Sequence, residues 1–174
     1  MTDFHLAEVN IGRIVAPLDS PALAGFVEQL DEINALADGA PGFVWRMVGE
    51  DGADATALRP DAADDRLLIN CSVWESAEAL RDFAYRSDHM RVLIRRREWF
   101  ERSVEPYLAL WWIPAGRVPT AAEAMRRIAL LRENGPGPGA FTFRNPFPAP
   151  DAAPPAAESA SGQLGLRIGR PAAR

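Results

Sequence analysis

The chain has 174 residues, 48% of them hydrophobic and 25% charged, which is the size and composition of one ordinary globular domain. All 19 basic residues are arginine, so the chain has no lysine for a Schiff base, a pyridoxal phosphate anchor or a P-loop. The net charge of -5 has the wrong sign for a protein that neutralises phosphates, so no nucleic acid partner is expected.

Cysteine and histidine are too scarce for the common metal centres. Cys71 is the single cysteine, which excludes an intrachain disulfide and a multi-cysteine zinc or iron–sulfur site. His5 and His89 cannot build a three-histidine zinc site, so no metal is predicted. No stretch approaches the roughly 18 continuous apolar residues of a membrane span, and the first residues lack a signal-peptide pattern. We therefore predict a soluble, cytoplasmic protein without a membrane partner.

The first half of the chain predicts two strands around a helix. Residues 6–15 alternate loosely and are rich in β-branched side chains, which indicates a strand. Ser20-Pro21 offers a helix start, and apolar residues recur at helical spacing over 23–36. Residues 42–48 alternate as a second strand, and the polar residues 49–65 are expected to form a loop.

The second half repeats this order. A strand is predicted over 66–74, and Ser76 is expected to cap a helix that is interrupted near Ser87-Asp88 and resumes over 90–100. In that second segment Met90, Leu93, Ile94, Arg97 and Phe100 are predicted to face inward. The remaining predicted elements are a strand over 107–113, a helix over 120–132 and an extended piece over 140–147. The Pro- and Ala-rich residues 148–174 predict a disordered tail, so the domain spans 1–147.

The order of these elements predicts an α+β fold. Two βαβ units with right-handed crossovers form a ferredoxin-like sandwich (βαββαβ), in which two helices cover one face of an antiparallel sheet. Most strands carry large apolar side chains on both faces, while the two helices cover one face. We therefore expect a second copy of the chain to shield the other face in a homodimer.

Three segments carry a resemblance to a known family. They are SVWESAEALRDFAYRSDHMRVLIRRREWFE at 72–101, LWWIPAGRVPTAAEA at 110–124 and GPGPGAFTFRNPFP at 135–148, with PGFVWR at 41–46 in support. Together they resemble a bacterial family of unknown function that is similar in fold to the antibiotic-biosynthesis monooxygenases, the dimeric α+β barrels. Members of that family usually read PAGH where this chain has Arg117. The resemblance spans roughly residues 4–148 and implies a homodimer.

The resemblance implies a pocket between the sheet and its covering helices. His89, at the break between two helical segments, is a candidate general base because imidazole titrates near neutral pH. The alternative is a capping or merely hydrogen-bonded histidine. Asn70 and Asn10 each lie inside an apolar strand, where an amide is costly to bury unless it is paired. Either amide can stabilise an enolate oxygen, or simply bond to a neighbouring strand or loop.

Aromatic side chains are the second group of candidates. Trp74, Trp99, Trp111 and Trp112 can form a stacking wall for a polycyclic substrate, with Phe83 and Tyr85 beside it, or they can be plain core. The arginine-rich stretch 95–97, with Arg91 and Arg102, is interpreted as a solvated helix face, and an anionic ligand is the alternative. Cys71, between apolar neighbours, is interpreted as an inert core thiol.

These residues favour a small-molecule enzyme without a tightly bound organic cofactor, acting on an aromatic or polyketide-like substrate. Oxygenation through an enolate, or a cofactor-free isomerisation or cyclisation, would use the same groups. One alternative is a haem-binding or haem-degrading protein, because the order Asn10, Trp74, His89 is similar to that in the haem-degrading branch of the superfamily. Another is a non-catalytic binding protein or structural dimer, which the Arg117 departure favours.

Overall fold

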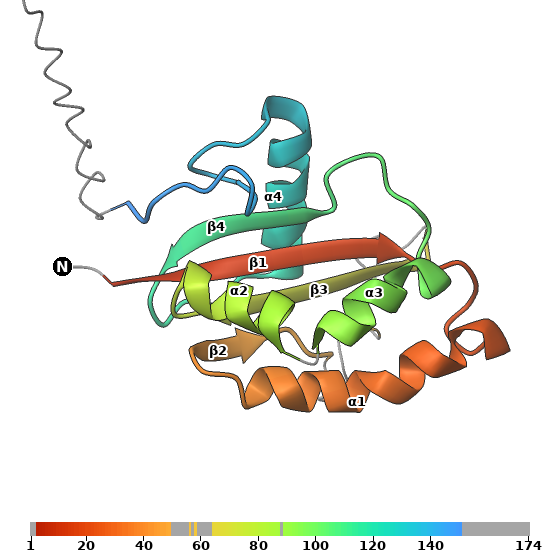
Figure 1. The fold of residues 1–174 in the computed structure, drawn as a ribbon. Coiled ribbons are helices and arrows are strands. Elements are labelled where there is room, and N and C mark those ends of the chain that lie inside the picture. The colour runs from red at the N-terminus through yellow and green to blue at the C-terminus, as the bar shows by residue number, and fades with distance from the viewer. Residues whose placement is uncertain (1–2, 50–55, 57, 59–63, 88, 151–174) are drawn as a thin grey trace, which may run out of the picture.

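The computed structural model describes residues 3–49, 56, 58, 64–87 and 89–150 (Figure 1). Its elements in chain order are β1 (Phe4–Arg13), the 3-10 turn η1 (Pro21–Leu23), α1 (Ala24–Asp38), β2 (Phe43–Arg46), β3 (Leu67–Trp74), α2 (Ala77–Arg86), α3 (His89–Trp99), β4 (Leu108–Pro114) and α4 (Ala121–Asn134). The predicted strands and helices are all present. Most of the predicted loop over 49–65 and of the predicted tail over 148–174 lies outside the described residues.

Side-chain caps explain where two of the helices begin. Ser76 Oγ accepts a hydrogen bond from the backbone N–H of Ala79 at the start of α2. Thr120 Oγ1 accepts one from Glu123 N–H at the start of α4. Each bond satisfies a backbone donor that the first helical turn leaves without a partner. Ser20 makes no such bond, and the chain enters α1 through η1 instead.

The four strands form one antiparallel sheet in the order β2-β3-β1-β4. The central strand β1 pairs with β3 so that Asn10 lies opposite Asn70, and with β4 so that Ala7 lies opposite Trp111. In Figure 1, α2 and α3 lie in front of the sheet, α1 runs along their lower edge, and α4 stands behind. This arrangement is the predicted α+β ferredoxin-like sandwich. None of the helices in the described residues has the length and apolarity that a membrane crossing requires.

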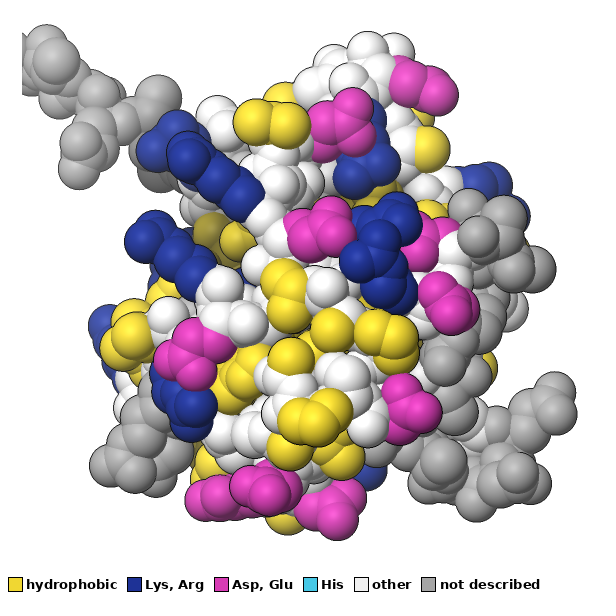
Figure 2. All heavy atoms as spheres, turned by 90° about the vertical axis from the view of Figure 1, so that its right-hand side faces the viewer, with side chains coloured by type: hydrophobic (Ala, Val, Ile, Leu, Met, Phe, Trp, Pro, Cys, Tyr) yellow, Lys and Arg dark blue, Asp and Glu magenta, His cyan; other side chains and the backbone are white. Residues whose placement is uncertain are grey.

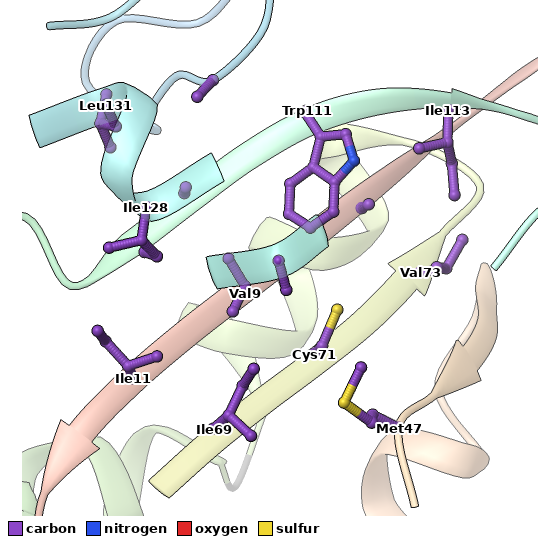
Figure 3. Packing of buried hydrophobic residues seen from close by; sticks show 14 residues of the cluster. Val9, Ile11, Met47, Ile69, Cys71, Val73, Trp111, Ile113, Ile128 and Leu131 are labelled. Atoms are coloured by element: carbon purple, nitrogen blue, oxygen red, sulfur yellow. The ribbon is translucent and has the colours of Figure 1, made fainter. Parts of the chain in front are cut away.

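The helix α4 covers the rear face of the sheet, opposite α2 and α3. Figure 3 shows side chains of β1, β3 and β4 pointing toward α4, and Val9, Cys71 and Trp111 are completely buried there. On the helix side, Ile128 and Leu131 complete the same cluster. Apolar strand residues on this face are therefore removed from water within one chain.

This packing corrects the argument for a homodimer. The expectation of a second copy rests on two helices that cover one face, and it does not count the predicted helix over 120–132 among the covering helices. In the structure that helix shields the face the second copy was to shield. The rear face is therefore not left uncovered and gives no support for a second copy. The homodimer remains a prediction.

The role of α4 can be tested by removing one of its buried side chains. We expect Ile128→Ala to lower the free energy of unfolding by about 2–4 kcal/mol, because it deletes buried apolar volume between α4 and the sheet. Denaturant unfolding would measure this loss. The matched control is Arg126→Ala, an exposed position on the same helix, which should change stability by less than about 0.5 kcal/mol. Equal effects of the two substitutions would contradict the packing described here.

Candidate functional site

A row of polar side chains crosses the front face of the sheet, which α2 and α3 cover. Glu8 and Asn10 of β1 lie opposite Ser72 and Asn70 of β3, and we call these four residues the polar belt. Apolar clusters lie at both ends of the belt. One contains Leu6, Trp74, Leu80, Leu110 and Phe141, and the other contains Ile14, Leu23, Leu68 and Trp99. Polar groups in such a setting are costly unless they are paired or serve a function.

Glu8 is the centre of a hydrogen-bond network within the belt. Asn10 Nδ2 donates to Glu8 Oε1 at 2.8 Å, and Ser72 Oγ donates to Glu8 Oε2 at 3.1 Å. Trp74 Nε1 in turn donates to Ser72 Oγ at 2.9 Å. Because an ionised carboxylate can only accept, Glu8 orients the Asn10 amide with its Nδ2 toward the carboxylate.

Burial changes the acidity of Glu8. The side chain is 4% exposed, and this burial raises the pKa of its carboxyl group to about 7. The hydrogen bonds from Asn10 and Ser72 and the positive charge of Arg96 act in the opposite direction. Desolvation dominates because the charged form loses more hydration than these partners replace. A carboxyl group with this pKa exists in both protonation states near neutral pH.

The belt reaches solvent at Asn70. Glu8 and Ser72 are buried, Asn10 is half-buried, and Asn70 is exposed. Asn10 and Asn70 are directly opposite each other, which places their Cβ atoms about 5 Å apart on the same face. The structure thus brings the two asparagines together, as the proposed role in holding one oxygen requires.

Arg96 approaches the belt from α3. Its NH2 donates to the Ile11 carbonyl at 3.1 Å, and its guanidinium lies over the rings of Phe100 and Tyr107 at 4.3 and 4.9 Å. Burial lowers the pKa of Arg96, partly offset by Tyr107 and by Glu8. Gly12 makes room for this arrangement, because a Cβ there would lie 2.5 Å from the Phe100 ring.

The prediction of which side chains over residues 90–100 face inward is therefore partly wrong. Ile94 is 71% exposed and Arg97 is also exposed, whereas Trp99 is buried and Arg96 is half-buried. Arg96 can lie on the sheet because its guanidinium finds a carbonyl acceptor and two aromatic rings there.

The aromatic candidates do not form one wall. Trp74 is 1% exposed and stacks on Phe83 at 5.0 Å, while Trp99 packs with Phe26 in the other apolar cluster. Trp111 lies on the rear face beneath α4, so the sheet separates it from the polar belt. Tyr85 is 47% exposed and touches the edge of the Phe143 ring. Trp112, the remaining tryptophan of the wall, donates Nε1 to the Phe147 carbonyl.

His89, Cys71 and Arg117 complete the sequence candidates. The backbone of His89 begins α3, but its side chain lies outside the described part of the chain, so its role remains a prediction. Cys71 is buried on the rear face, where burial raises the pKa of its thiol, which agrees with an inert core residue. Arg117 forms an ion pair with Glu123 of α4 at 2.6 Å. This contact holds the start of α4 and does not involve the polar belt.

The described residues do not fit a haem site built on Trp74. Its indole is 1% exposed, stacks on Phe83 and donates to Ser72, so it offers no open face to a macrocycle. Within the described ranges there is also no cluster of three or more histidine, cysteine or acidic side chains suited to a metal ion.

Sequence reasoning missed Glu8 and Ser72, and it interpreted Arg96 as part of a solvated helix face. The one available signal was Glu8 itself, an ionisable residue between Ala7 and Val9 in an apolar strand. Its neighbour Asn10 was noticed for the same reason. Ser72 carries no such signal, because serine is common at exposed positions of strands.

The raised pKa of Glu8 predicts a pH dependence of stability. A carboxyl group with a higher pKa in the folded than in the unfolded state stabilises the fold below its unfolded pKa, and this contribution is lost as pH rises to the folded value. We therefore expect the free energy of unfolding to fall by roughly 3 kcal/mol between about pH 4.5 and about pH 7 on account of Glu8. Glu8→Gln, which cannot ionise, should lack this part of the fall.

Denaturant unfolding at several pH values measures the effect, with Glu133→Gln at an exposed position of α4 as the control. The control should follow the unsubstituted protein at every pH. Parallel curves for Glu8→Gln and the unsubstituted protein would contradict the burial of an ionisable carboxyl group.

Comparison with solved structures finds several of related fold at low identity. SnoaB, a cofactor-independent oxygenase from Streptomyces nogalater, is 18% identical, with a TM-score of 0.43 over 66% of this chain and 95% of that chain. A conserved protein from Methanosarcina mazei Go1 is 11% identical, with a TM-score of 0.44 over 64% and 93%. The ActVA-Orf6 monooxygenase of Streptomyces coelicolor, in complex with nanaomycin D, is 16% identical, with a TM-score of 0.36 over 68% and 94%.

No curated protein matches the chain with significance. A family model does: that of a domain of unknown function, DUF3291, matches residues 5–157, which is most of the chain. This match confirms the resemblance to a family of unknown function that the motifs indicated. The chain therefore belongs to the DUF3291 family.

Proposed function

We propose that this protein is a small-molecule enzyme that acts on an aromatic or polyketide-like substrate at the polar belt. The observation that supports this most directly is the pair of facing amides, Asn10 and Asn70, at the open end of a buried polar network. A purely structural interface between helices and sheet would be expected to place apolar side chains at the buried positions of this network, Glu8 and Ser72.

The two amides suit a substrate that develops negative charge on oxygen. One N–H of Asn10 Nδ2 is used by Glu8, which leaves the second for a ligand. The exposed Asn70 amide can donate to the same oxygen from the neighbouring strand. Two such donors stabilise an enolate or phenolate relative to the neutral substrate, which lowers the barrier to removing a proton.

Glu8 acts in this scheme as a positioning residue. In its ionised form it holds the Asn10 amide, and with a pKa near 7 it can take up a proton when negative charge develops beside it. A neutral Glu8 spares the enolate the repulsion of a second anion. His89 remains our candidate for the base that removes the substrate proton.

The reaction class follows from the enolate. Its carbon can donate an electron pair to dioxygen to form a C–O bond. Proton uptake then gives a hydroperoxide, and loss of water leaves a carbonyl, so that the substrate supplies all the electrons and no tightly bound organic cofactor is needed. Alternatively, the enolate can be reprotonated or attack intramolecularly, as in an isomerisation or cyclisation. A non-catalytic protein would bind the same compounds and leave them unchanged.

The test is oxygen uptake and product formation with a panel of polycyclic phenols and their keto tautomers. For a compound that is turned over, we expect Asn70→Ala to lower kcat about 100-fold, because it removes one donor to the developing oxyanion. The control is Asn134→Ala at the exposed end of α4, which should leave kcat unchanged.

Product formation with oxygen uptake supports the monooxygenase-like reaction, and product formation without it supports isomerisation or cyclisation. Binding of the panel without any product would favour the non-catalytic alternative. Equal rates for Asn70→Ala and the unsubstituted enzyme would contradict the role given to the belt.

A further inference from the structure

A hollow of about 610 Å³ lies where α3 ends and the chain turns toward β4. Its lining comes from the last turn of α3, from residues 100–103 and from Tyr107. We call it the α3 hollow. Its volume is in the range of small-molecule sites, and it is distinct from the open end of the belt at Asn70.

Positive charge is concentrated in this hollow. Arg96, Arg97 and Arg102 all line it, and within the described residues none of these three forms an ion pair. Arginines elsewhere, such as Arg95 and Arg127, do pair with a carboxylate. Three neighbouring guanidinium groups repel one another, and an anion that entered would relieve this repulsion.

The one acidic group of the lining is already engaged. Glu101 Oε1 lies 3.3 Å from Arg66 NH1 and 3.6 Å from Arg13 Nε, two arginines that are not part of the lining. Its charge is therefore shared with arginines other than the three in the hollow. Figure 2 views the side where β1 ends and α1 begins, and there basic side chains lie in several places among acidic and apolar ones.

Arg96 is held in place before any ligand arrives. Its NH2 is fixed by the Ile11 carbonyl, and its flat guanidinium is in contact with the rings of Phe100 and Tyr107. A guanidinium fixed in this way loses little conformational entropy on binding, and its fork of donors matches the two oxygens of a carboxylate.

The aromatic lining of the hollow indicates the chemistry of the rest of the ligand. Tyr107 lines the hollow and is 40% exposed, whereas the Phe100 ring carries the Arg96 guanidinium on one face and also packs against Phe26. A planar ring can stack on such a surface, which a small inorganic anion cannot use. Charge and aromatic surface together therefore favour a ligand that has both.

We propose that the α3 hollow binds an aromatic carboxylate. The three guanidinium groups hold the carboxylate, and the exposed ring surface of Tyr107 holds the aromatic part. This site goes beyond the proposed reaction, since it requires neither turnover nor the asparagines of the belt. Arg95 and Arg97 are exposed, as the interpretation of a solvated helix face predicts, and the proposal takes up the alternative of an anionic ligand for Arg96, Arg97 and Arg102.

Calorimetric titration of the full chain with three probes tests the proposal. The probes are 2-naphthoate, its neutral analogue 2-naphthamide and inorganic phosphate. We expect 2-naphthoate to bind at least about tenfold more tightly than either of the others, because it alone offers both charge and ring. Its affinity should fall on going from about 0.05 to about 0.5 M salt, as charge pairing at a partly exposed site is screened.

Substitutions then locate the binding. Arg97→Gln and Arg102→Gln should each weaken 2-naphthoate binding about five- to tenfold, and both lie at exposed positions where folding is not at risk. The matched control is Arg95→Gln on the same helix, which pairs with Glu98 outside the hollow and should leave the affinity unchanged.

Three results would overturn the proposal. Equal binding of 2-naphthoate and 2-naphthamide would show that the arginines do not recognise charge. Equal binding of phosphate would show a general anion site that does not use the Tyr107 ring. An equal loss in Arg95→Gln and Arg97→Gln would show that net charge, and not the hollow, determines binding.

Discussion

The burial of the Glu8 carboxyl group is the constraint on which the front face of the sheet, covered by α2 and α3, depends. A carboxylate in that position is stable only with several partners, and Asn10 and Ser72 supply them directly. Trp74 supports Ser72 in turn, so its indole is fixed by a polar bond as well as by stacking. The same network that satisfies Glu8 therefore orients the Asn10 amide at the edge of the opening.

The two faces of the sheet have different roles. The rear face is an apolar cluster closed by α4, with Cys71 and Trp111 in its interior. The front face combines two apolar clusters with the polar belt between them, and it carries the candidate chemistry. Stability and function can separate in this way because successive side chains of a strand point to opposite faces.

Arg96 connects the belt with the α3 hollow. Its guanidinium lowers the pKa of Glu8 and at the same time lines the hollow. An anion bound beside Arg96, as proposed, would weaken that effect and so would favour proton uptake at Glu8. The connection arises because α3 lays one long, cationic side chain across the end of β1.

The sequence by itself determined the strands, the helices and the α+β fold, since their periodicity and caps are local properties of the chain. It also singled out Asn10 and Asn70, but their position opposite each other follows from the pairing register of β1 with β3. Only the tertiary structure decided which side of the sheet Trp74 and Trp111 face and that α4 closes the rear. It likewise decided that Glu8 is buried with partners from another strand. These features depend on contacts between residues far apart in the chain, and such contacts leave no local pattern in the sequence.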